Sequence, residues 1–274
     1  MIEPIPDYKN LDLSGEAQQA AARMEARAQE AASQKMFQQL IAPLLTAQVK
    51  TVFEFGCGTA ALARRIARAA AQAVVYASDK SAGMLKVAQH LVDAEHIDNI
   101  RLQLWDVLDE TTFPFPTAQF DLILSSVVVP YLDDAQVVVL IERLSARLSP
   151  GGILAFVEQD WASDTVYFPR TELVRDVLNK DARNPKRTLA LGLRPILRGA
   201  GLQVLPRCSF LWTDDAYGAY TRDLLEKFGD AACDQGRIQP GEREEWKRTL
   251  AELAGSGDFY YGIVYHRVAG RRGM

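Results

Sequence analysis

The chain has few cysteines and histidines, no long apolar run and no excess of positive charge. Three cysteines in 274 residues exclude a disulfide framework, and the three scattered histidines complete no Cys/His spacing of a zinc site, so no metal is expected. No apolar segment approaches the roughly 20 residues that a membrane-spanning helix needs. Because 31 basic side chains face 35 acidic ones, no surface for nucleic acid is expected.

What remains is the composition of a globular protein, 48% hydrophobic and 24% charged. Its length suggests one large domain, or one domain with an insertion. The first residues, MIEPIPDYKN, lack the basic and apolar segments of a signal peptide. We therefore expect a cytoplasmic protein.

The N-terminal part is predicted to be helical. Residues 1–14 are polar and contain proline, which is typical of a loosely held arm. Ser14 is a plausible N-cap for a long helix over about 15–33, and a second helical stretch follows at 33–45. We expect residues 1–48 to form an N-terminal cap, either as a surface helix or as a lid over a pocket.

Short apolar runs alternate with helical segments in the middle of the chain. Strands are predicted at 51–56, 73–79, 99–106, 120–129 and 151–160. Strand and helix in alternation predict a parallel sheet built from right-handed crossovers. The fold class is therefore α/β, with helices on both faces of the sheet.

The C-terminal part departs from this alternation. Helices are expected over 171–200, and β-rich runs at 201–213 and 257–270. The residues between these two runs carry helical patterns near 215–229 and 240–254. We expect a helical insertion over about 214–256, within a domain that covers 49–274.

A glycine turn follows the first predicted strand. Gly56, Cys57 and Gly58 lie between that strand and a helix, where glycine allows a tight turn and close approach of a ligand to the backbone. The free N–H groups at the start of the helix suit a polar or anionic ligand group. Asp79 ends the next strand, 21 residues after Gly58, where a carboxylate can accept both hydroxyls of a ribose.

Two cofactor classes fit this turn. Gly56, Gly58 and Ala61 satisfy the relaxed dinucleotide fingerprint G-x-G-x-x-G/A, so a nicotinamide oxidoreductase is a remote alternative. Tyr76 and Lys80 have the spacing of a short-chain dehydrogenase pair. They fall at the end of a strand, however, whereas such a pair should share a helical face.

Five motifs in order resemble a different family. They are Glu54-Phe55-Gly56-Cys57-Gly58, Asp79-Lys80-Ser81-Ala82-Gly83-Met84-Leu85, Trp105-Asp106-Val107, Phe120-Asp121-Leu122-Ile123-Leu124-Ser125-Ser126 and Leu148-Ser149-Pro150-Gly151-Gly152. In these residues the chain resembles the class I S-adenosylmethionine-dependent methyltransferases, within a small-molecule group similar to quinone methyltransferases. Ala60 replaces the third glycine of the common motif, and Pro130-Tyr131 stands where many relatives carry histidine.

The resemblance implies a Rossmann-like, seven-stranded, mostly parallel sheet with an antiparallel last strand and a helical cap. It implies that S-adenosylmethionine contacts Glu54, Gly56, Cys57, Gly58, Asp79, Lys80, Met84, Asp106, Val107, Ser125 and Ser126. Among these, Glu54 and the glycine turn would hold the methionine portion, and Asp79 the ribose. Met84, Asp106 and Val107 would lie at the adenine. The backbone of Ser125 and Ser126 would lie near the amino group and sulfonium.

Candidate acceptor-side residues follow the fifth strand and lie in the expected insertion. Glu158 and Asp160 are the candidates for a catalytic role, although no catalytic motif is evident. Candidates for substrate binding are Trp161, Tyr167, Tyr217 and Tyr220, with Gln159, Phe168 and Phe228 as further neighbours. A solvated loop and ordinary packing explain these residues equally well. Arg23 and Arg27, one helical turn apart, either form surface salt bridges or contact the cofactor carboxylate from a lid.

The leading hypothesis is methyl transfer from S-adenosylmethionine to an O, N or C atom of a small organic molecule, achieved mainly by positioning. The alternative is a protein that binds S-adenosylmethionine without transferring methyl, or that uses the same scaffold for another reaction. The sequence leaves the acceptor, the methylated atom, a general base and the oligomeric state open.

Overall fold

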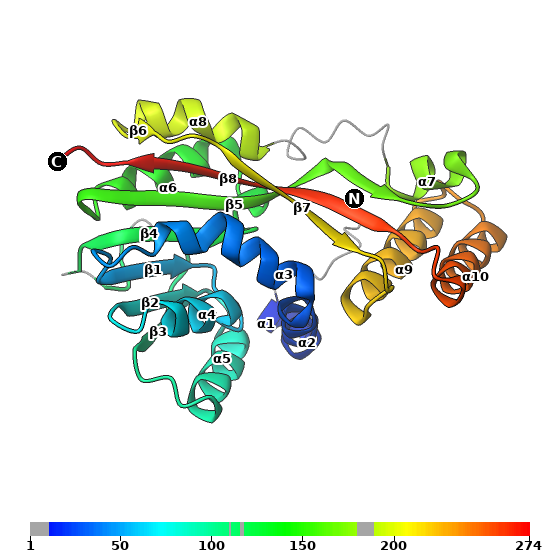
Figure 1. The fold of residues 1–274 in the computed structure, drawn as a ribbon, viewed down its shortest axis with the longest axis horizontal. Helices are drawn as coiled ribbons and strands as arrows, with labels where there is room; N and C mark the ends of the chain where they lie inside the picture. The colour runs from blue at the N-terminus through cyan, green and yellow to red at the C-terminus, as the bar shows by residue number, and fades with distance from the viewer. Residues whose placement is uncertain (1–10, 110, 116–117, 180–188) are drawn as a thin grey trace.

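The computed structural model describes residues 11–109, 111–115, 118–179 and 189–274 (Figure 1). Eight strands in this part of the chain form one sheet, in the order β3-β2-β1-β4-β5-β8-β6, and β7 also pairs with β8. Their bounds are β1 Thr51–Phe55, β2 Val74–Asp79, β3 Ile100–Leu104, β4 Phe120–Ser126, β5 Leu148–Val166, β6 Gln203–Val204, β7 Cys208–Asp214 and β8 Tyr261–Arg271.

The sheet has the expected parallel core and antiparallel last strand. Strands β1 to β5 pair in parallel, and β8 pairs antiparallel with β5, β6 and β7. The strand count differs from the expected seven because the run 201–213 forms two strands, β6 and β7, on either side of Pro206. Proline supplies no N–H to a ladder, which favours a break there.

Helices cover both faces of the parallel strands. On one face lie α4 (Ala61–Ala69) and α5 (Ala82–Ala94), and on the other α6 (Asp134–Ser145) and α8 (Leu189–Gly199) (Figure 1). A hydrophobic core lies on each face of the sheet. Successive side chains of one strand point to opposite faces and therefore pack in different cores. Val52 packs in the first cluster with Ile66, whereas Phe53 packs in the second with Leu140.

The N-terminal segment is broken where one helix was predicted. It consists of α1 (Leu11–Ser14), α2 (Ala17–Gln29), α3 (Ala31–Met36), a π-helical turn (Phe37–Ile41) and a 3₁₀ turn (Ala42–Leu44). The prediction of a continuous helix over 15–33 with Ser14 as its N-cap was wrong. Ser14 ends α1, Gly15 has a φ of 74°, and Glu30 is extended between α2 and α3. The Ser33 hydroxyl stabilises this break by donating to the Arg27 carbonyl at 2.6 Å. The expected arm at 1–10 lies outside the described residues.

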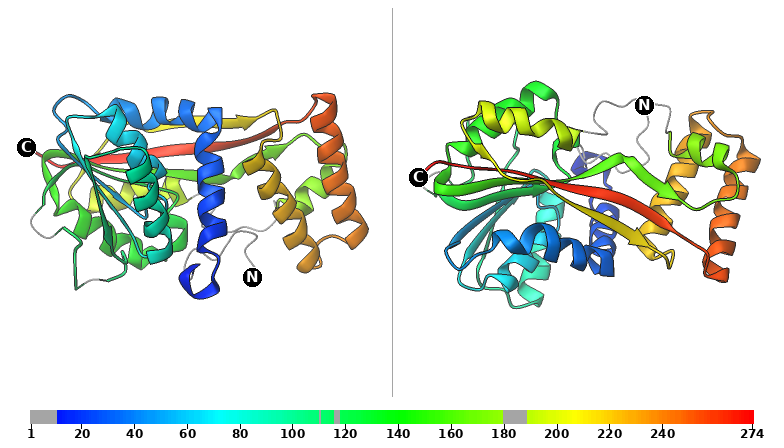
Figure 2. Two further views of the ribbon diagram at one scale, coloured as in Figure 1. Left: turned by 90° about the horizontal axis from the view of Figure 1, so that it is seen from below. Right: turned by 45° about the horizontal axis from the view of Figure 1, so that its top comes forward.

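Strands β5, β8 and β7 extend well beyond the parallel strands and carry α7 (Thr171–Val177), α9 (Ala219–Asp234) and α10 (Pro240–Ser256). In both views of Figure 2, α2 stands between the parallel half of the sheet and the α9–α10 pair. Within the described residues, none of the helices is both long and apolar enough to cross a membrane.

Candidate functional site

The glycine turn connects β1 to α4 through left-handed backbone. Gly56 has a φ of 63° and Gly58 a φ of 54°, values that favour glycine. Neither position has room for a side chain, because a Cβ at Gly56 would collide with Val128, and one at Gly58 with Met24 of α2. The burial of Cys57 raises the pKa of its thiol well above the usual value, so the thiol is protonated and unreactive.

Asp79 ends β2 beside this turn. Its Oδ2 accepts the N–H of Gly58 at 2.8 Å, and its Oδ1 accepts the N–H of Ser81 at 2.9 Å. Burial raises the pKa of Asp79, and the two N–H groups act in the opposite direction. Because each carboxylate oxygen can accept two hydrogen bonds, Asp79 retains acceptor capacity for a further donor such as a hydroxyl group.

Buried oxygens without hydrogen-bond partners among the described residues lie on four adjacent strands, close to where the parallel pairing of the sheet ends. They are Ser78 Oγ in β2, Glu54 Oε2 in β1, Ser125 Oγ in β4 and Glu158 Oε2 in β5. Burial is the main cause that raises the pKa of Glu54 and of Glu158, in each case to about 8. Buried polar groups without partners are costly, so their concentration at one edge of the sheet indicates a place for a polar or cationic ligand.

The loop after β4 is strained. Val127 has a φ of 58°, which is a true outlier for a β-branched residue. Its N–H donates to the carbonyl of Val157 at 3.0 Å. Glu158 Oε1 accepts the next two N–H groups, from Val128 at 3.3 Å and Val129 at 3.4 Å. The Glu158 carboxyl group therefore holds the strained loop in place.

The predicted adenine-side residues lie at the ends of β2 and β3. Asp106 follows β3 and accepts the N–H of Leu108 at 2.9 Å, while the carbonyl of Val107 accepts from Arg143 at 3.1 Å. Lys80 is exposed. Met84 is completely buried in a cluster with Leu11, Ala20 and Ala21 of the N-terminal helices.

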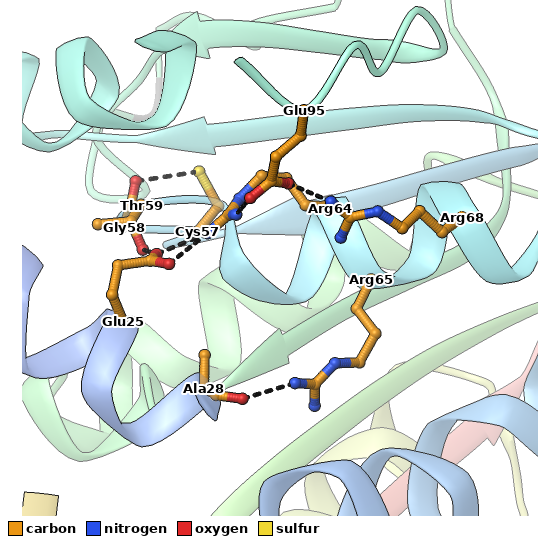
Figure 3. A network of polar contacts seen from close by, with 9 residues as sticks. All are labelled: Glu25, Ala28, Cys57, Gly58, Thr59, Arg64, Arg65, Arg68 and Glu95. Atoms are coloured by element: carbon orange, nitrogen blue, oxygen red, sulfur yellow. Dashed lines mark hydrogen bonds and ion pairs between the residues drawn. The ribbon is translucent and has the colours of Figure 1, made fainter. Parts of the chain in front are cut away.

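Helix α2 is attached to the glycine turn by polar contacts (Figure 3). Glu25 accepts from the Thr59 hydroxyl at 2.5 Å and from Arg64 of α4 at 2.6 and 2.7 Å. Just before α2, Asp12 accepts from the Ser81 hydroxyl at 2.6 Å and from the N–H groups of Ala82 and Gly83, so it caps α5. The N-terminal segment thus contacts both the glycine turn and the start of α5, which lie on either side of Asp79.

Of the two arginines of α2, Arg23 is buried and does not form a surface salt bridge. Arg23 is 8% exposed and forms an ion pair with Asp223 of α9. Arg27 lies near the site, where its positive charge lowers the pKa of Glu54 and Glu158 and it forms a hydrogen bond with the Tyr265 side chain. The tertiary fold, by placing α9 against α2, buries what the sequence pattern suggested would be a solvated helix face.

The predicted acceptor-side aromatics have separate partners. Trp161 contacts Phe228 with ring centroids 5.9 Å apart, Tyr220 contacts Trp212 at 5.7 Å, and Tyr217 contacts Phe259 at 4.8 Å. Phe168 stacks on Trp246, and Tyr167 is 56% exposed. The expectation that Glu158, Asp160 and Trp161 follow the fifth strand was wrong, because β5 continues to Val166 and its pairing with β8 keeps all three within the strand. Trp161 and Phe228 join this extended part of β5 to α9.

Sequence reasoning missed a polar group on the extended strands. His266 of β8 faces Ser209 of β7 with Nδ1 2.7 Å from the hydroxyl, and its Nε2 is 3.5 Å from Asp160 Oδ2. On the other side of the strands, Gln159 donates to the Tyr265 hydroxyl at 2.7 Å. Only the antiparallel register of β5, β8 and β7 could have revealed these neighbours. No group of three or more His, Cys, Asp or Glu residues in the described parts could hold a metal ion.

Comparisons with known proteins match this chain to methyltransferases. Residues 52–152 match the family model described as a methyltransferase domain. The chain is 29% identical to trans-aconitate 2-methyltransferase of Delftia acidovorans over 154 residues, 56% of this chain and 52% of that protein. It is 32% identical to malonyl-[acyl-carrier protein] O-methyltransferase of Hahella chejuensis over 103 residues, 38% of this chain and 34% of that protein. The matched region therefore spans about half or less of these relatives.

The fold is shared with a candidate methyltransferase from Bacillus halodurans C-125. The TM-score is 0.50 at 15% identity, covering 85% of this chain and 98% of the other. The matched family region begins in β1 and ends within β5, so it contains the glycine turn, Asp79 and the loop after β4. Residues 52–152 therefore carry a methyltransferase domain, and the chain shares the fold of this methyltransferase neighbour.

Proposed function

We propose that the chain transfers the methyl group of S-adenosylmethionine to a small organic molecule. The observation that carries this proposal is the set of unpartnered buried oxygens of Glu54, Ser125 and Glu158 beside the glycine turn. S-adenosylmethionine brings an ammonium and a sulfonium group, and cations of this kind suit buried carboxyl groups that lack partners.

Each part of the cofactor has a candidate partner. The acceptor capacity of Asp79 suits the ribose hydroxyls, and Asp106 with the Val107 N–H suits the adenine edge. Glu54 suits the ammonium group, and Arg27, whose positive charge lowers the pKa of Glu54, suits the carboxylate of the methionine portion. When bound, S-adenosylmethionine supplies an activated methyl group on sulfur. The chain's own contribution is to hold the acceptor in line with that methyl and to exclude water.

The N-terminal segment up to about residue 48 and the helices α9 and α10 form the two sides of the acceptor region in this proposal. The contact of Trp161 with Phe228 supports an apolar wall between them. The names of the two relatives, one acting on trans-aconitate and one on a malonyl group, support a small or carrier-bound organic acceptor. The three free cysteines support a reducing compartment, so we propose the cytoplasm.

Calorimetric titration with S-adenosylhomocysteine tests the cofactor assignment, with NADH as the parallel ligand. We expect micromolar binding of S-adenosylhomocysteine only, and its loss in Asp79→Ala with an unchanged circular dichroism spectrum. Tight binding of NADH alone would overturn the proposal in favour of an oxidoreductase.

Turnover distinguishes an enzyme from a protein that only binds the cofactor. Methyl-labelled S-adenosylmethionine is incubated with the protein and a small-molecule extract, and we expect label to enter a low-molecular-weight product. Binding without any label transfer would favour the non-catalytic alternative.

A further inference from the structure

Glu158 combines a fixed oxygen with a free one. Its Oε1 is held by the N–H groups of Val128 and Val129 at 3.3 and 3.4 Å, so the position of the carboxyl group is determined by the backbone. Its Oε2 has no hydrogen-bond partner within the described residues. Water cannot readily supply one, because Glu158 is only 1% exposed. Holding the loop in place requires only Oε1. Oε2 therefore remains able to bind another partner.

The place of Glu158 in the sheet puts its carboxyl group beside the loop that follows β4. Glu158 lies on β5, next to β4, and its neighbours Val128 and Val129 follow the Ser125–Ser126 end of β4. Adjacent strands are about 4.8 Å apart, so the carboxyl lies within side-chain reach of whatever occupies the end of β4.

Charged groups around Glu158 come from three elements. Arg27 of α2 is the cation whose charge lowers its pKa. On β8, His266 is its partner in register, and on β5, Asp160 lies 3.5 Å from that histidine. Because Asp160 already faces His266, the histidine is not a dedicated counter-ion for Glu158. Arg27 is shared with the second buried carboxyl, Glu54.

We propose that Glu158 Oε2 accepts a proton from the methyl acceptor, and that the carboxyl ionises when a positive sulfonium is bound next to it. This inference rests on the proposed function and deepens it. Burial keeps the carboxyl neutral in the absence of a further cation, since its pKa is raised to about 8. A positive charge within about 4–6 Å favours the ionised form.

The step balances without a further reactant. The acceptor's O–H or N–H bond breaks, its proton passes to Glu158 Oε2, and the freed electron pair forms the bond to the methyl carbon. The carbon–sulfur bond breaks, and the thioether leaves with its electrons. The sulfur of the product is neutral, so the carboxyl remains protonated until the proton is lost to solvent. This arrangement suits an acceptor whose nucleophilic atom carries a proton at neutral pH, such as a phenol or an enol, rather than a carboxylate.

Proton release on ligand binding tests the ionisation without any acceptor. Titration calorimetry at pH 7 in two buffers of different ionisation enthalpy compares S-adenosylhomocysteine with sinefungin, which carries an amine in place of the sulfonium methyl. Both ligands have the same adenosine and amino acid portions. The difference in proton release therefore isolates the effect of a positive charge at the position of the sulfonium group. We expect sinefungin to release more protons than S-adenosylhomocysteine, by up to about one per site.

The variant Glu158→Gln should abolish this difference, because an amide retains the oxygen that accepts the Val128 and Val129 N–H groups and loses the titrating proton. Glu244→Gln, at a side chain that is 62% exposed, is the control for loss of a carboxylate and should retain it. Equal proton release by both ligands in the wild type, or an excess that persists in Glu158→Gln, overturns the inference. Failure of both ligands to bind would overturn the proposed function instead.

The acceptor class is tested with methyl-labelled cofactor. We expect label in a panel of phenols and enols, with a rate that rises with pH in the wild type and is lowered and less pH-dependent in Glu158→Gln. Label only in a matched panel of carboxylic acids, or in neither panel, overturns the assignment of the acceptor class.

Discussion

The hydroxyl of Thr59 in the glycine turn donates a hydrogen bond of 2.5 Å to Glu25 of helix α2. Thr59 is completely buried, and Glu25 is also held by Arg64 of α4. The N-terminal helix is therefore fixed to the loop that we propose binds the cofactor. A displacement of the helix would therefore disturb the turn through this contact.

Removing this hydrogen bond should weaken cofactor binding. We expect Thr59→Val to lower the affinity for S-adenosylhomocysteine by about tenfold, since a hydrogen bond to a charged group contributes roughly 1.5–3 kcal/mol. Calorimetric titration measures the change. Glu95→Gln is the control, because Glu95 binds Arg64 without contacting Thr59, and it should leave the affinity within about twofold.

Gly58→Ala should impair both stability and binding. The φ of 54° disfavours alanine, and the added methyl group would collide with the sulfur of Met24. We expect a loss of about 1–3 kcal/mol in the free energy of unfolding, measured by urea denaturation, and weaker binding of S-adenosylhomocysteine.

Gly241→Ala is the matched control for that substitution. Gly241 lies in the first turn of α10, and a methyl group there would meet open space. Its effect on the free energy of unfolding should stay within about 0.5 kcal/mol. If Gly58→Ala proved equally harmless, the turn would not need glycine at that position.

The stability of the protein should fall as pH rises. Glu54 and Glu158 have pKa values raised to about 8, from an ordinary value of 4.5. A raised pKa in the folded state means that the neutral carboxyl stabilises the fold fully below about pH 4.5. This contribution is lost progressively up to about pH 8, at roughly 1.4 kcal/mol per pH unit for each group.

Denaturation at several pH values between 5 and 9 measures this effect. Glu158→Gln should make the free energy of unfolding less dependent on pH, whereas Glu244→Gln, whose side chain is 62% exposed, should leave the dependence unchanged. A wild-type stability that is constant or rises between pH 6 and 8 would contradict the expectation.

The ion pair of Arg23 with Asp223 should be asymmetric in its response to mutation. The Arg23 side chain is 6% exposed and that of Asp223 is 39% exposed. Asp223→Asn leaves a buried cation without its counter-charge and should cost about 3 kcal/mol, whereas Arg23→Met leaves a partly exposed carboxylate near Lys227 and should cost about 1 kcal/mol.

The double variant completes this comparison. With both charges removed, the stability should be higher than that of Asp223→Asn alone. Equal losses in the two single variants would indicate that Arg23 reaches solvent in solution.

The order of strand and helix from residue 51 to residue 160 follows from the sequence, because apolar periodicity and the glycine turn are local properties. The parallel core and the antiparallel last strand were predicted and are present. The breaks at Gly15 and Glu30 were not predicted. An Ala-rich segment has the same helical propensity on both sides of a bend, and the bend is decided by the surfaces against which α2 and α3 pack.

The features of the candidate site also separate into those that follow from the sequence and those that depend on the tertiary structure. The sequence by itself determined the glycine turn after β1 and the place of Asp79 at the end of β2, since each lies at a fixed distance along the chain from a strand that positions it. Only the tertiary structure decided that Glu25 binds Thr59, that Arg23 is buried against Asp223, and that Glu158 holds the loop after β4. Burial, charge pairing and cross-strand neighbours depend on elements far apart in the chain, and no local pattern records them.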